Sequence, residues 1–313
     1  MSSPKVGGIL TNFAKLVDAS LPWKDGIVVM LKAYFDASTR AESGVFCVAG
    51  VALTSDGAKL LEQRLNDVFG KRRCHMTDLH ARKGAFAGID DSEAGSLCRG
   101  AIAAINECAL AVATISCDVA EVTSLIPTNA TPDAESLADT MRGPYNTCLH
   151  WTMMVMGRMF DLEPPQRIQY WFEMGDEFQG AARRFLAVIN GHQFAEPLRR
   201  SYAYGSDVFA AKADVVPFDA ADVVAWEWRK HVERIRANQK ERPSLTALMN
   251  GSCTADGQAF HNTNARYGNH FTGASLRRYF DKMGAVMRAT SVEEIELAVQ
   301  RGSSRELPFG QRA

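Results

Sequence analysis

The order of short apolar runs and longer amphipathic runs most strongly limits the folds open to this chain. LKAYFDAS and VFCVAGVALT are short, apolar and rich in aromatic or branched residues, so they predict a β-hairpin. DGAKLLEQRLNDVFG repeats apolar residues at helical spacing and ends at a glycine, as helices often do. A hairpin and a further strand, followed by helix, strand, helix, strand and helix, predict an α/β fold with a mixed sheet flanked by helices.

The predicted elements follow from the same two patterns along the whole chain. Strands are predicted at 31–38, 45–54, 109–118, 167–177 and 201–210, and helices at 56–70, 91–108, 145–159, 178–190 and 218–239. The cap of the second helix is predicted at Asp91 or Ser92. The stretch HNTNARYGNH is rich in Asn and Gly, which predicts a polar loop.

Composition excludes several classes of protein. The chain has 313 residues, of which 46% are apolar, enough for a large core, yet it contains no apolar run of membrane-spanning length. Its seven cysteines form no Cys-x-x-Cys pair, which argues against a disulfide framework and a structural zinc site. With no secretory signal pattern, a cytoplasmic protein is expected. The net charge of −1 gives no global basic field, but clusters such as KRRCH leave room for a basic groove.

The sequence suggests four segments. Residues 1–29 are expected to be an N-terminal extension with some helical spacing, and 30–240 to be the catalytic domain. Residues 241–300 are expected to form a helical region packed on that domain, and 301–313 a mobile tail. The extension would suit packing on the domain or on a second subunit, so a homo-oligomer stays open.

Acidic residues inside apolar stretches point to function. In VVPFDAADVVAW, Asp219 and Asp222 are three positions apart and share a helix face. Asp222 stands among Ala and Val, where a carboxylate is costly without a partner or a metal, whereas Asp219 has the alternative of being a helix cap. Asp36 and Glu173 are placed at the ends of predicted strands. Carboxylates gathered at one sheet edge are the ligands that hard divalent cations prefer.

Four motifs carry a resemblance to a known family. AYFDAST, CHMTDLHARKGAF, YWFEMGDEFQG and VVPFDAADVVAWE occur in this order between residues 31 and 231. Together they resemble the domain-of-unknown-function 3800 family, which is similar to ribonuclease H-like folds. The resemblance implies a ribonuclease H-like mixed sheet, with three antiparallel strands first and parallel additions after, and metal-dependent nuclease activity. The chain departs from the family pattern at Ala37, where the family has Glu, and at Asp219, where it has Gln.

The resemblance implies specific roles for these residues in a two-metal mechanism with Mg²⁺ or Mn²⁺. Asp36 would bridge both ions, and Glu173 and Asp222 would each flank one. The catalytic set implied is Asp36, Glu173, Asp222 and His75, and the metal-binding set is Asp36, Glu173, Asp222, Asp219 and Asp78. For His75 the reading as an ordinary loop histidine stays open, and Asp176 or Glu177 stands as an alternative to Glu173.

The expected function is divalent-metal-dependent hydrolysis of a phosphodiester in RNA or DNA. Basic side chains are then expected to rim the site, with Arg72, Arg73, Arg82, Lys83 and Lys212 as candidates. One alternative is a catalytically silent module of the same fold that binds nucleic acid or a protein partner. A glycoside hydrolase with a carboxylate pair is a third possibility, which would need no metal and would therefore keep its activity in chelator.

Overall fold

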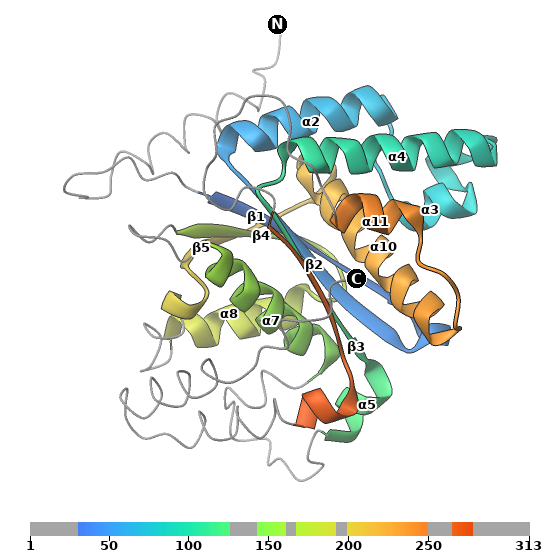
Figure 1. The fold of residues 1–313 in the computed structure, drawn as a ribbon. Coiled ribbons are helices and arrows are strands. Elements are labelled where there is room, and N and C mark those ends of the chain that lie inside the picture. The colour runs from blue at the N-terminus through green and yellow to red at the C-terminus, as the bar shows by residue number, and fades with distance from the viewer. Residues whose placement is uncertain (1–30, 126–142, 161–166, 192–198, 250–264, 278–313) are drawn as a thin grey trace, which may run out of the picture.

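The protein, seen here as a computed structural model, is built on one mixed sheet with helices on both faces (Figure 1). The structure describes residues 31–125, 143–160, 167–191, 199–249 and 265–277. The strands of the sheet are β1 (Leu31–Arg40), β2 (Val45–Leu53), β3 (Ala111–Asp118), β4 (Ile168–Glu173), β5 (Tyr204–Ala210) and β6 (Ala265–Phe271). Their order across the sheet is β5-β4-β1-β2-β3-β6.

Strand direction follows from the pairing. β2 is antiparallel to both of its neighbours, β1 and β3, whereas β4 and β5 add in parallel beside β1, and β6 adds in parallel beside β3. Among these described strands, β2 alone therefore runs opposite to the rest. The carboxyl ends of β1, β4 and β5 meet at one edge of the sheet, the position where open α/β sheets commonly place a ligand.

The helices form two layers. They are α2 (Ser55–Phe69), α3 (Met76–Ala81), α4 (Asp91–Cys108), α5 (Val119–Leu125), α7 (Pro144–Met159), α8 (Gln179–Gly191), α10 (Pro217–Arg236) and α11 (Pro243–Met249). Three short 3₁₀ turns lie in the connections: η1 (Ala41–Ser43) between β1 and β2, η2 (Gly84–Phe86) between α3 and α4, and η3 (Lys212–Asp214) between β5 and α10. α2, α3, α4, α10 and α11 cover one face of the sheet, and α5, α7 and α8 cover the other (Figure 1).

Alternation along the strands divides the core in two. On β1, Tyr34 packs in the core under α10, whereas Phe35 packs in the core under α7 and α8. β2 is buried along its whole length because both faces of the sheet are covered there. Gly44 closes the β1–β2 connection with φ of 63°, a left-handed conformation that favours glycine.

The predicted strands and helices are present in the structure, with shifts at their ends. The cap of α4 is Asp90, whose side chain accepts from the amide of Glu93, one residue before the predicted cap. The helices α3 and α5 are additional to the prediction, whereas α11 falls in the segment that was expected to be helical. α3 and α5 have only six and seven residues, too few for an apolar repeat to reveal.

The prediction of a polar loop at 261–270 was wrong for the part that the structure describes. Residues Ala265–Phe271 form β6, which pairs along its length with β3. The edge of β3 supplies the backbone partners, so polar side chains suffice in this strand. Gly268 is needed there because a Cβ would lie 2.3 Å from the Trp228 ring on α10.

The expected segment boundaries are only partly visible. Residues 1–29 and 301–313 lie outside the described residues, so the predicted extension and tail stay predictions. The segment 241–300, expected to be helical, contributes α11, which packs on α4 and α10, and also the strand β6. It therefore completes the same sheet rather than adding only helices to it.

Candidate active site

Four charged side chains meet at the carboxyl edge formed by β1, β4 and β5. Asp36 lies one residue beyond the last β1 residue paired with β4, and Glu173 is the last residue of β4. Lys212 follows the end of β5, and Asp222 lies in the second turn of α10, which packs across this part of the sheet. We call Asp36, Glu173, Asp222 and Lys212 the acidic cluster.

The lysine lies at the centre of the acidic cluster. Its Nζ is 3.1 Å from Asp36 Oδ2, 3.3 Å from Asp222 Oδ2 and 3.6 Å from Glu173 Oε2. No two of these oxygen atoms are therefore separated by more than twice the longest of these distances. The side chain of Asp222 is 9% exposed and that of Glu173 is 22% exposed, so solvent reaches the cluster mainly from the Glu173 side.

Charge in the acidic cluster is unbalanced, since three carboxylates share one ammonium group. Burial raises the pKa of the Asp36 carboxyl to about 7, and the charges of Asp222 and Glu173 act in the same direction against the lowering effect of Lys212. Burial alone would lower the pKa of Lys212, but Asp222, Asp36 and Glu173 outweigh it and leave the pKa well above its usual range. The Lys212 ammonium thus stays charged, and the excess negative charge appears as the raised pKa of Asp36.

Backbone amides fix two of the carboxylates. The amide of Ala37 donates to Asp36 Oδ1 at 2.8 Å, and the amide of Met76 donates to Asp222 Oδ2 at 3.3 Å. Both bonds hold the oxygen atoms in place without neutralising their charge. Asp222 therefore has both a cationic partner and a backbone donor. These two contacts explain how a carboxylate can be buried in a stretch of Ala and Val.

Asp219 belongs to a different arrangement from Asp222. The Arg73 guanidinium donates to Asp219 Oδ1 at 2.7 Å and to Oδ2 at 3.1 Å, and the amide of Cys74 donates to Oδ2 at 2.9 Å. Arg73 also donates to the carbonyls of Ala213 and Val215, so it ties α10 to the preceding turn. The burial of Asp219 is thus explained by an ion pair, without a metal ion.

The other predicted members do not join the acidic cluster. His75 is exposed and precedes α3, between the two residues whose amides bind Asp219 and Asp222. Asp78 lies in α3 with its carboxylate directed at the Gly84 turn, where a Cβ would be 3.4 Å from Oδ2. Asp176, an alternative to Glu173, accepts from the amide of Phe178 in the loop before α8.

Position 37 faces the other way. The side chain of Ala37 packs against the core under α7 and α8, whereas Asp36 points to the α10 side. A longer acid at position 37 would therefore point away from Lys212. The presence of Ala37 in place of the family's Glu therefore removes no carboxylate from the acidic cluster.

Most residues of the predicted basic rim are paired elsewhere. Arg72 lies over the Phe86 ring and near Glu93, and Arg82 pairs with Asp91 on the exposed side of α4. Lys212 was predicted for the rim but lies inside the cluster. Sequence reasoning missed that central role because a single lysine in the turn between a strand and a helix carries no signal of its direction.

The donor chemistry of the acidic cluster fits a divalent cation in part. Three carboxylates on rigid elements supply the oxygen ligands that Mg²⁺ and Mn²⁺ take, and they already hold one cation, the ammonium of Lys212. Within the described ranges, however, no group of three or more His, Cys, Asp or Glu side chains is arranged to hold a metal ion. The residues fit a metal ion by chemistry, while their present geometry is set by lysine.

Comparison with known proteins adds no assignment, because no family model and no curated protein matches this chain. Among the described helices, none combines the length and the apolar character needed to cross a membrane.

Proposed function

We propose that the protein is a ribonuclease H-like phosphodiester hydrolase that acts on RNA or DNA with the help of Mg²⁺ or Mn²⁺. The observation that carries this proposal is the convergence of Asp36, Glu173 and Asp222 on one cation at the carboxyl edge of the sheet. The sheet supports it as well, since three antiparallel strands with parallel additions are what the resemblance implied. Several carboxylates brought together away from water have little structural value on their own.

In this proposal the chain's own residues hold and balance the charge. Asp36, Glu173 and Asp222 would bind the cation, and the amides of Ala37 and Met76 keep two of them oriented. When bound, a divalent metal ion polarises the phosphodiester and lowers the pKa of its bound water. His75 is exposed between the two residues whose amides bind Asp219 and Asp222, and it keeps the proton-transfer role that the resemblance implied.

Lys212 has a double role in this proposal. Its ammonium contacts the three carboxylates that would hold a metal ion, so the two cations would compete for them. Once displaced, a permanently charged ammonium at this edge is a ready donor to a phosphate oxygen. Lys212 therefore keeps the cluster intact without metal and would contact the substrate when metal is present.

The test is cleavage of single-stranded RNA and DNA by the wild type, Asp36→Asn and Asp222→Asn with Mn²⁺. Each Asn variant should lose more than about 100-fold in activity, beyond the loss typical for contacts outside the ligand shell. Asp214→Asn is the matched control because Asp214 is exposed and only two residues from Lys212. Melting temperatures measured alongside separate lost chemistry from lost fold. Activity of Asp222→Asn equal to that of the wild type, or cleavage that persists in chelator, would contradict the proposal.

A second candidate is a catalytically silent module of the same fold that binds nucleic acid or a protein partner. It is favoured by the central position of Lys212, because an ammonium that bridges three carboxylates stabilises them without any metal. Wild-type protein that binds single strands but cuts neither RNA nor DNA with Mn²⁺ would select this candidate.

We further propose a cytoplasmic location. The cysteines of the described residues are free thiols, and most are buried. Cys117 and Cys148 lie with their sulfur atoms 3.5 Å apart in the core without forming a disulfide. Free thiols this close are expected in a reducing compartment.

A further inference from the structure

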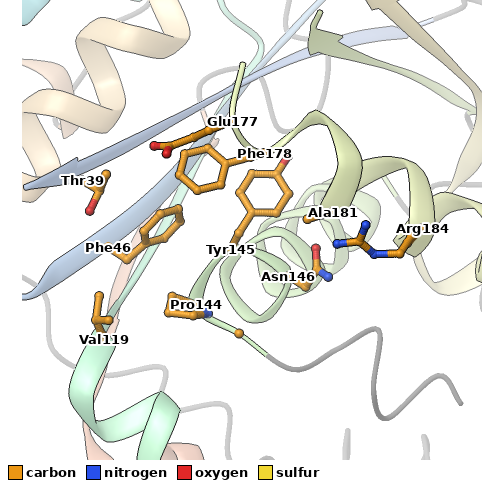
Figure 2. A pocket seen from close by; sticks show the side chains of 11 residues that line it. Thr39, Phe46, Val119, Pro144, Tyr145, Asn146, Glu177, Phe178, Ala181 and Arg184 are labelled. Carbon is orange, nitrogen blue, oxygen red and sulfur yellow. The ribbon is translucent and has the colours of Figure 1, made fainter. Parts of the chain in front are cut away.

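A cavity of about 430 Å³ opens on the α7 and α8 side of the sheet, the face opposite to the one that Asp36 points to (Figure 2). It lies between the end of β1, the loop after β4 and the start of α7. Its lining residues are Thr39, Phe46, Val119, Gly143, Pro144, Tyr145, Asn146, Glu177, Phe178, Ala181 and Arg184. Its volume falls in the range of pockets that hold small organic ligands.

Aromatic rings make up the inner part of this cavity. Phe178 stacks on Tyr145 with ring centroids 5.0 Å apart and planes at 4°, and it meets Phe46 edge-on at 5.1 Å. Figure 2 shows the three rings side by side in the middle of the cavity lining. Phe178 and Tyr145 are only half-buried, so this aromatic surface is not sealed within the core.

Polar groups of both signs surround the rings. Glu177 and Thr39 lie on one side and Arg184 on the other (Figure 2), and all three are exposed. Within the described part of the chain, no hydrogen bond or ion pair engages the side chains of these three residues. They are therefore available to a ligand, and their mixture of carboxylate, hydroxyl and guanidinium suits the donors and acceptors on a nucleobase edge.

The cavity and the acidic cluster are built from the same strands. Thr39 follows Asp36 by three residues on β1, which corresponds to about 10 Å along a strand. Glu177 follows Glu173 by four residues in the loop after β4.

We propose that this cavity receives one unpaired nucleobase of the strand whose phosphodiester lies at the acidic cluster. This inference rests on the proposed function and adds a substrate class to it, namely single-stranded nucleic acid. Aromatic faces bind bases by stacking with little dependence on sequence, and a base still paired in a duplex is not free to enter. The exposed polar rim argues against an apolar side chain or lipid as the occupant.

The test is binding of five-nucleotide single strands of uridine or thymidine in the presence of chelator, with no cleavage required. The same strands with abasic sugars serve as the ligand control. Phe178→Leu keeps an apolar side chain but removes the ring, and it should weaken binding of the intact strands about tenfold. It should leave the weaker binding of the abasic strands unchanged. Phe178→Tyr restores the ring and should bind as the wild type does, while Arg184→Gln should weaken binding by a smaller factor.

The outcomes separate this inference from the proposed function. Equal affinity of intact and abasic strands for the wild type, or wild-type affinity in Phe178→Leu with an unchanged melting temperature, would overturn the nucleobase pocket. Cleavage that needs Mn²⁺ and Asp222 but ignores the abasic change would overturn the pocket alone. Binding that depends on the base and on Phe178, without any cleavage by the wild type, would keep the pocket and remove the nuclease.

Discussion

Two positions on α10, five residues apart, hold buried carboxylates in opposite ways. Near its start, Asp222 shares a single ammonium with Asp36 and Glu173. Farther along, Glu227 is fully buried and receives two bonds from the Arg242 guanidinium, at 2.9 and 3.1 Å, and one from Ser244 at 2.8 Å. The second arrangement is balanced in charge and saturated in hydrogen bonds, as structural ion pairs are. The first carries more negative than positive charge, and for that reason we propose it as the site of a further cation.

The largest effect on stability is expected at Glu227, the acid whose charge is balanced by Arg242. Glu227→Gln removes the charge opposite Arg242 and should lower the free energy of unfolding by about 3 kcal/mol, since one partner of a buried ion pair is left alone. Chemical denaturation measures this change. Mn²⁺ binding should stay as in the wild type, and a loss of stability below about 1 kcal/mol would show that Glu227 is not a structural acid.

A smaller loss is expected when the shared cation is removed. Lys212→Met leaves three acids without an ammonium and should lower stability by about 2 kcal/mol in chelator, less than a full unpaired charge because Asp36 takes up a proton. Mn²⁺ at about a hundred times its Kd would return about 2.7 kcal/mol. Melting temperatures with and without Mn²⁺ test both statements. If Mn²⁺ did not stabilise Lys212→Met more than the wild type, the proposed competition would be wrong.

Asp36→Asn is expected to increase stability, and the increase should depend on pH. The folded pKa of Asp36 is raised to about 7, above the ordinary value near 3.9 for an unfolded chain. The folded state therefore holds the extra proton, and this contribution is complete below the unfolded pKa and lost as pH rises through 7. The variant should be more stable than the wild type at pH 8 and show little advantage at pH 4.

Denaturation at both pH values tests that prediction. Asp214→Asn, at an exposed acid nearby, is the control and should be neutral at both. A destabilised Asp36→Asn at pH 8 would mean that Asp36 is held by Lys212 as firmly as Glu227 is by Arg242.

The smallest effect is expected at Asp219. Asp219→Asn keeps the hydrogen-bonding shape but removes the charge facing Arg73, which is partly exposed, so stability should fall by about 1 kcal/mol. Mn²⁺ affinity should not change, because the charge of Asp219 is balanced by Arg73 and not shared with the acidic cluster. A clear loss of Mn²⁺ affinity in this variant would return Asp219 to the metal-binding set.

Much of the fold could be read from local pattern. Strands and helices with sustained periodicity, such as β2 and α10, were predicted because burial repeats along them. β6 was missed because its residues are polar and form a strand only through backbone pairing with β3, which is far away in the sequence. The convergence of Asp36, Glu173 and Asp222 was predicted from their places at strand ends and a helix start. The inward direction of Lys212 and the capture of Asp219 by Arg73 depend on tertiary packing, which no local pattern records.

The central claim is that the acidic cluster binds a divalent cation because its three carboxylates outnumber its one ammonium group. Calorimetric titration of Mn²⁺ into the wild type, Asp222→Asn and Asp219→Asn tests it most directly. We predict that the wild type and Asp219→Asn bind Mn²⁺ with the same affinity, and that Asp222→Asn binds at least about tenfold more weakly. Wild-type protein that binds no Mn²⁺, or Asp222→Asn that binds it equally well, would contradict the claim.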